Sequence, residues 1–150
     1  MFSLDTAYAS ISHMSRENVE LVRRIYDAFA RRDIVTPFEI YAEDIVWDLS
    51  HTARGNLFPQ PVLHGHEGVR EGWRDVLGAF AEVDFTVEEL TDADDKVFAT
   101  IRELDVGRAS GASVSALHFA VWTLDSGKVA RLQVFDERAP AEEAAGLRTS

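Results

Sequence analysis

The alternation of apolar and polar positions is clearest in the C-terminal half of the chain. Three segments there have side chains of period two and are rich in β-branched and aromatic residues, which is typical of strands. These segments are residues 97–106, 114–123 and 129–135. The two connections contain Gly107 and Gly111 in one case and Gly127 in the other, so each suits a turn between antiparallel neighbours. The pattern predicts a three-stranded antiparallel unit with apolar side chains on both faces.

The N-terminal half contains helical patterns as well as strand patterns. In residues 15–32, Val19, Val22 and Phe29 recur at three- and four-residue spacing, which predicts an amphipathic helix behind an N-cap at Ser15. The other predicted elements are a short helix over 33–44, a strand over 45–49, a loop over 50–65, a helix over 66–80, a strand over 84–91 and a terminal helix over 139–147. This order indicates an α+β fold with helices on one side of a curved antiparallel sheet. The other side then needs a cavity, a partner chain or both.

Composition mainly excludes classes of function. A chain of 150 residues fits one domain, and a formal net charge of -11 disfavours binding to nucleic acid or to anionic membranes. The chain has no cysteine, which excludes disulfides, thiolate metal sites and a cysteine nucleophile. No apolar run approaches the roughly 20 residues that span a bilayer, and the first residues lack the features of a signal peptide. We therefore expect a cytoplasmic protein.

The first residues differ from the rest. Residues 1–13 are small and polar without a clear period, whereas Met14 heads an orderly segment. We treat residues 1–13 as an extension of uncertain origin and order, and residues 14–150 as a single domain.

Several short sequence motifs occur in an order and at a spacing that are typical of one protein family. The motifs are ENVELVRR at residues 17–24, AEDIVW at 42–47, GHEGV at 65–69, GKV at 127–129, and FD at 135–136 followed by EEAAGL at 142–147. Together they resemble the SnoaL-like and ketosteroid-isomerase-like proteins of the nuclear transport factor two-like superfamily. The resemblance implies a cone-shaped curved sheet wrapped around an apolar pocket, with three helices of the N-terminal half packed on it. It also implies a homodimer through the sheet face. Members include isomerases, cyclases, epoxide hydrolases and non-catalytic binding modules, so the fold alone does not give the function.

The resemblance to steroid isomerases is only partial at the catalytic positions. In their register, Ile25 and Leu49 stand where the oxyanion-hole tyrosine and the base aspartate are found. Tyr26 and Asp48 lie one place away, and one place on a strand is the opposite face. The second oxyanion-hole acid of that type falls near His118 or Phe119.

The epoxide-hydrolase type resembles the chain no more closely. It needs an Asp-Arg-Asp set around a water, and the corresponding positions read Ile101, Glu103 and Gln133, with Arg102 off by one. The cyclase type uses a pocket acid or base to shift a proton, a pattern too loose to decide from sequence.

Three ionisable side chains are our candidates for catalysis. Asp48 would be a base with a raised pKa in an apolar pocket, or else a solvated carboxylate at a strand end. His118 lies in mid-strand, where it would move a proton or bind a carbonyl, or else be a hydrogen-bonded core histidine. Glu103 would pair with Gln133 across the sheet and act as the acid, or else be a surface carboxylate paired with an arginine.

The predicted pocket also needs walls. The side chains that we expect to contact a substrate are Tyr26, Trp47, Trp73, Gln133 and Phe135, although aromatic residues fill cores equally well. His64 and His66 have a spacing that can share a metal, but a turn at Gly65 and a helix start at His66 explain the same residues. We predict no metal and no cofactor.

These observations lead to a hypothesis with open alternatives. The main one is a pocket for a small apolar molecule, in an enzyme that transfers a proton on a carbonyl, enone or epoxide without a cofactor. The rival is a non-catalytic binding or dimerisation module, and a third is a cyclase-like accessory protein of one pathway. Two or more polar side chains that converge inside an open cavity would favour the enzyme.

Overall fold

The structure is a computed structural model that describes residues 4–147, with the side chains of residues 15–56 and 58–147. The elements are α1 (Leu4–Ala30), η1 (Thr36–Glu39), β1 (Tyr41–His51), η2 (Gly55–Leu57), β2 (Val62–His64), α2 (Gly65–Ala79), β3 (Phe80–Ala93), β4 (Lys96–Gly107), β5 (Ser113–Asp125), β6 (Lys128–Phe135) and α3 (Arg138–Ala144). Within this range, no helix has both the length and the apolar stretch needed to cross a membrane.

The strands form one curved sheet in the order β2-β1-β6-β5-β4-β3. The predicted antiparallel unit is confirmed as β4, β5 and β6, and β3 and β2 also pair in antiparallel fashion with their neighbours. One pair differs from the prediction, because β1 runs parallel to β6. A parallel pair needs a long crossover, and here the chain between β1 and β6 includes α2 and the β3–β5 meander. The α+β class and the curved sheet are confirmed.

The predicted and observed element boundaries differ most in the segment from residue 33 to residue 65. The predicted helix over 33–44 shrinks to the single turn η1, because β1 already begins at Tyr41. The Asp33 carboxylate accepts hydrogen bonds from the backbone N–H groups of Val35 and Thr36 at 3.0 and 2.9 Å, so it holds the chain in the turn that leads into η1. The predicted loop over 50–65 contains η2 and β2, and β2 pairs with β1 through Val46–His64 and its neighbours.

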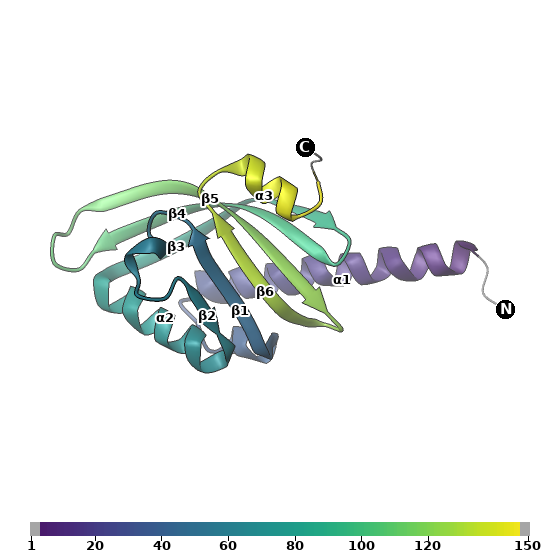
Figure 1. Cartoon of the computed structure of the whole chain (residues 1–150), viewed down its shortest axis with the longest axis horizontal. Coiled ribbons are helices and arrows are strands. Elements are labelled where there is room, and N and C mark those ends of the chain that lie inside the picture. Colours follow the sequence, from purple (N-terminus) through teal and green to yellow (C-terminus); the bar gives the residue numbers. More distant parts are fainter. Residues whose placement is uncertain (1–3, 148–150) are drawn as a thin grey trace.

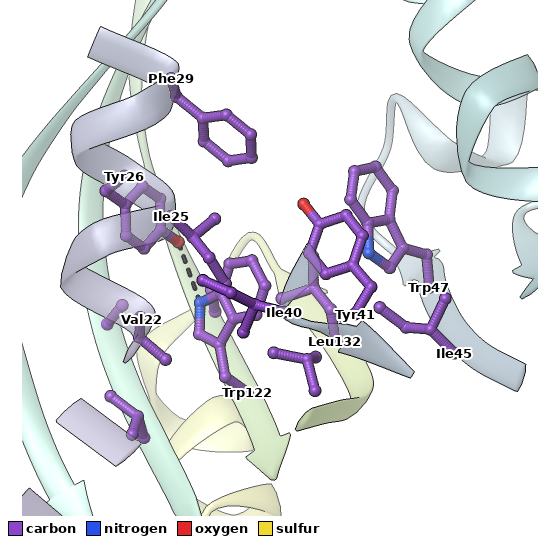
Figure 2. Close-up of a cluster of buried hydrophobic side chains, with 14 of the residues drawn as sticks. Val22, Ile25, Tyr26, Phe29, Ile40, Tyr41, Ile45, Trp47, Trp122 and Leu132 are labelled. Carbon is purple, nitrogen blue, oxygen red and sulfur yellow. Dashed lines mark hydrogen bonds between the residues drawn. The ribbon is translucent and has the colours of Figure 1, made fainter. Parts of the chain in front are cut away.

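The two faces of the sheet carry different layers. Figure 1 shows α1 and α2 on the concave face and α3 on the convex face. The main core lies under α1 and α2, and Figure 2 shows part of it, including Tyr26 and Trp122. A smaller core lies under α3 and contains Phe98, Val121 and Phe135. Both faces are therefore buried in part, as the apolar pattern on both sides of the strands predicts.

The N-terminal segment continues the first helix. Residues 4–13 belong to α1, whereas the sequence pattern predicts the helix only from Ser15, and in Figure 1 this part of the helix extends beyond the sheet. Residues 1–3 and 148–150 lie outside the described range. The division into an extension and a domain stays a prediction.

The segment around His64 and His66 has the structural role that the sequence indicated. Gly65 begins α2 with a φ of 72°, a conformation that favours glycine. The Nε2 atom of His66 lies 3.1 Å from the carbonyl oxygen of Tyr41, which ties the helix start to β1.

Candidate active site

A cavity of about 480 Å³ lies between the concave face of the sheet and the two long helices. This volume is within the range of pockets that hold small molecules. Aromatic side chains from α1, α2, β3 and β5 form much of its wall: Tyr26, Phe29, Trp73, Phe85 and Trp122. With Trp47 of β1, all three tryptophans of the chain line the cavity, so their fluorescence would report on its contents.

Strand geometry brings ionisable side chains to one part of this wall. Glu103 and Asp105 are two residues apart on β4, so both face the cavity. On β5, His118 pairs with Ile101 and is therefore a diagonal neighbour of Glu103. The His118 Nδ1 atom lies 2.9 Å from Glu103 Oε1. The carboxylate thus holds one ring nitrogen, which leaves His118 Nε2 for another partner.

Arg54 completes the group from the turn between β1 and η2. Its Nη1 donates to Glu103 Oε2 at 2.6 Å and its Nη2 donates to Asp105 Oδ2. The next residue, Gly55, packs so closely on β1 that an added Cβ would lie 1.9 Å from the carbonyl oxygen of Leu49. A larger residue at Gly55 would push the turn away, so this glycine helps to place the guanidinium between the two carboxylates. We call Arg54, Glu103, Asp105 and His118 the inner cluster.

The two carboxyl groups of the inner cluster have different proton affinities. Burial and the adjacent Glu103 raise the pKa of Asp105 to about 6, although Arg54 acts against this. Burial alone would raise the pKa of Glu103 too, but the hydrogen bonds with His118 and Asp105 and the charge of Arg54 lower it to about 2. One oxygen of Asp105, Oδ1, is buried and has no hydrogen-bond partner among the described residues. Glu103 is therefore the stable anion, and Asp105 is the group that takes up a proton near neutral pH.

Tyr26 adds a neutral hydroxyl to the same cavity. Its Oη accepts a hydrogen bond from Trp122 Nε1 at 3.1 Å, drawn as a dashed line in Figure 2, so its own O–H proton remains free to donate. Burial raises the pKa of Tyr26 well above its ordinary value, despite this bond. The Tyr26 and His118 rings both contact Phe85, with ring centres 6.4 and 5.8 Å from that of Phe85. A phenol donor and an imidazole thus lie on the same stretch of wall.

The structure brings five of the eight predicted site residues to the cavity: Tyr26, Trp47, Trp73, Glu103 and His118. The interpretation of Glu103 as a surface carboxylate does not apply, because its side chain is 12% exposed and bound to Arg54 and His118. Its expected pairing with Gln133 is also absent, since β5 lies between β4 and β6.

Asp48, Gln133 and Phe135 do not line the cavity. Asp48 follows Trp47 on β1, so it faces the convex side, where it accepts hydrogen bonds from Ser50 N and Oγ at 3.0 and 2.5 Å. Gln133 lies on β6 between two residues that line the cavity, so its own side chain points to the other face of the sheet. Phe135 belongs to the core under α3 and stacks on His51 with ring centres 4.6 Å apart.

Sequence reasoning missed Arg54 and Asp105. Asp105 could have been found, because it is two residues after Glu103 on a predicted strand and so shares its face. Arg54 has no such signal, since it lies in a segment without periodicity and reaches β4 across 49 residues of sequence.

Comparison with known proteins fits this architecture. The family model of the SnoaL-like domain matches residues 22–132. The chain belongs to the SnoaL-like domain family. Its resemblance to SnoaL-like proteins is therefore confirmed, and no curated protein matches it.

Solved structures agree with the SnoaL-like fold. An NTF2-like protein of unknown function from Burkholderia pseudomallei is 22% identical, with a TM-score of 0.72, over 89% of this chain and 98% of that one. TerC, co-crystallised with polyporic acid, is 19% identical, with a TM-score of 0.71, over 87% and 98%. A candidate SnoaL-like polyketide cyclase from Jannaschia is 18% identical, with a TM-score of 0.68, over 90% and 94%. At these identities the likeness establishes the fold alone.

Proposed function

We propose that this SnoaL-like protein binds a small, mainly apolar carbonyl compound in its cavity and shifts a proton on it, as an isomerase- or cyclase-type enzyme. The observation that carries the proposal is the His118–Glu103 pair, with 2.9 Å between Nδ1 and Oε1, on the wall of an aromatic cavity. A cavity of a pure binding module needs no such group, because buried charges cost free energy unless they are paired or used.

His118 is the proposed general base. Because the pKa of Glu103 is low, this side chain is a carboxylate that accepts the Nδ1 proton and fixes the ring orientation. The other nitrogen, Nε2, then carries the lone pair that removes a proton next to the substrate carbonyl. Glu103 also stabilises the imidazolium that forms, as a carboxylate does in other histidine dyads.

Tyr26 is the proposed hydrogen-bond donor to the substrate oxygen. Removal of a proton beside a carbonyl places negative charge on that oxygen, and a donor in a dry site stabilises the charge. The high pKa of Tyr26 keeps its hydroxyl protonated, and the bond from Trp122 Nε1 orients it. Arg54 and Asp105 position Glu103 and take no part in the proton transfer in this scheme.

One observation favours a second candidate, epoxide hydrolysis. Arg54 bridges two carboxyl groups in the cavity, which is the type of set that an epoxide hydrolase needs around its water. In that case Asp105, with its raised pKa, would donate a proton to the epoxide oxygen, and Glu103 would activate the water.

Solvent isotope incorporation tests both candidates without a known product. The protein is incubated with cyclic ketones and enones in D₂O and with epoxides in H₂¹⁸O, and the products are followed by mass spectrometry. We expect deuterium exchange beside the carbonyl, about 100-fold slower in His118→Asn and in Tyr26→Phe. His51→Asn, on the convex face, is the matched control and should exchange at the parent rate. Exchange at the parent rate in His118→Asn would show that the base is assigned wrongly, and ¹⁸O-labelled diols without exchange would favour the second candidate.

A further inference from the structure

The charges around the cavity are strongly unequal. Among the described residues that line it, five are acidic, namely Glu71, Asp75, Glu103, Asp105 and Asp136, whereas Arg54 alone is a lysine or arginine. The whole chain carries a formal net charge of -11, so the surrounding surface adds to the negative potential in the cavity. A low-dielectric wall makes this imbalance matter more than it would in water.

The excess of negative charge also exists among the buried ionisable side chains of the site. Glu103 and Asp105 are 12% and 4% exposed, and they share one guanidinium, which leaves one negative charge in excess when both are ionised. The unpartnered Oδ1 of Asp105 is the acceptor that remains without a donor in this group. A proton compensates the excess charge in acid, and a cation in the cavity would compensate it equally well.

The remaining wall suits an apolar cation. Seven aromatic rings line the cavity: Tyr26, Phe29, Trp47, Phe58, Trp73, Phe85 and Trp122. Aromatic faces carry partial negative charge and attract ammonium groups, most strongly when water is excluded. An anionic ligand would meet both these faces and the excess carboxylate.

We propose that the natural ligand of this cavity is an apolar molecule bearing a protonated amine, and that the cavity rejects carboxylates of the same shape. The proposal names the substrate class of the acid–base site described above and rests on that site being the ligand site. The ammonium group lies toward Asp105, and the apolar body lies among the aromatic rings.

Three adamantanes of nearly equal shape provide the test: 1-adamantanamine, 1-adamantanemethanol and 1-adamantanecarboxylate. None absorbs where tryptophan does, and the three tryptophans of the chain all line the cavity, so quenching or a shift of their emission at pH 7.5 reports binding. We expect the amine to bind most tightly, the alcohol less so, and the carboxylate at least tenfold more weakly than the amine. Asp105→Asn should reduce the ratio of amine to carboxylate affinity about tenfold, while Asp48→Asn on the convex face should leave it unchanged.

Equal affinities, tighter binding of the carboxylate, or no response to the amine would overturn the proposal, as would an unchanged ratio in Asp105→Asn. These compounds undergo no proton transfer, so the result is independent of the isotope experiment. If the amine binds preferentially but no isotope exchange occurs, only the proposed catalysis is refuted. If exchange occurs but the amine is not preferred over the carboxylate, only the proposed amine ligand is refuted.

Discussion

The two faces of the sheet carry clusters made from nearly the same side chains. The inner cluster faces the cavity, and the outer cluster lies on the convex face and comprises Asp48, Ser50, His51 and Arg131. Each combines carboxylate, arginine and histidine. In the outer cluster, Asp48 receives two hydrogen bonds from Ser50, and Arg131 and His51 lie 3.5 Å away. In the inner cluster, two carboxyl groups compete for one arginine.

The difference lies in how well each charge is compensated. Burial alone would raise the pKa of Asp48, but the hydrogen bonds from Ser50 and the nearby His51 and Arg131 lower it below its usual value. Asp105 shifts in the opposite direction, to about 6. Residue type therefore says little about the state of these groups: the charge of Asp48 in the outer cluster is well compensated, whereas that of Asp105 in the inner cluster is not. A homodimer through the sheet face stays a prediction.

The largest expected difference between the clusters is in turnover. Glu103→Gln retains an acceptor for His118 Nδ1–H but removes the charge that stabilises the imidazolium, so we expect kcat on an exchanging ketone to fall about 100-fold or more. The matched change in the outer cluster, Asp48→Asn, should leave kcat within about twofold of the parent. Steady-state rates of exchange by mass spectrometry measure both. A large loss in Asp48→Asn with full activity in Glu103→Gln would reverse the assignment of the two clusters.

The sequence predicted the fold better than the site, and particular residues explain why. Periodicity depends on local alternation, so β4, β5, β6 and α2 were predicted within a few residues of their bounds. The same alternation puts Glu103 and Ile101 on one face of the strand, and the structure has Glu103 on the wall of the cavity. Asp48 does not reach the cavity, because neighbouring residues of a strand point to opposite faces and Trp47 takes the cavity side. Arg54 was beyond any local pattern, since only the folded sheet brings the turn after β1 to β4.

The second-largest expected difference between the two clusters is in the free energy of unfolding when the arginine of each cluster is replaced. Arg54→Met would leave Glu103 and Asp105 buried without their shared cation, which we expect to cost about 2–3 kcal/mol at pH 7. Arg131→Met removes a 47% exposed partner from Asp48, whose bonds from Ser50 remain, so its cost should stay below about 1 kcal/mol. Urea unfolding measures both.

The cause of the Arg54 effect can be checked with a double variant. Adding Asp105→Asn to Arg54→Met removes one of the two stranded charges and should recover about half of the loss. A loss that does not recover would attribute the effect to the packing of Arg54 on the Phe80 ring, whose centre lies 4.7 Å from the guanidinium carbon.

The smallest expected effect is on the melting temperature and its dependence on pH. It separates the two clusters best, because Asp105→Asn and Asp48→Asn should change the melting temperature at pH 7 in opposite directions. The pKa of Asp105 is higher in the folded protein than the ordinary value of 3.8, so this group favours folding in acid, and that contribution is lost as the pH rises from about 4 to about 6. Asp105→Asn should therefore melt at the parent temperature near pH 4 and a few degrees higher at pH 7, corresponding to about 1 kcal/mol.

The pKa of Asp48 is lowered in the folded protein, so its contribution to stability is present above pH 3.8 and is lost as the pH falls. Asp48→Asn should melt lower than the parent at pH 7, and the gap should close in acid. Calorimetry of the three proteins between pH 3 and 7.5 measures the two differences, and equal signs at pH 7 would contradict the contrast between a strained inner carboxyl and a satisfied outer one.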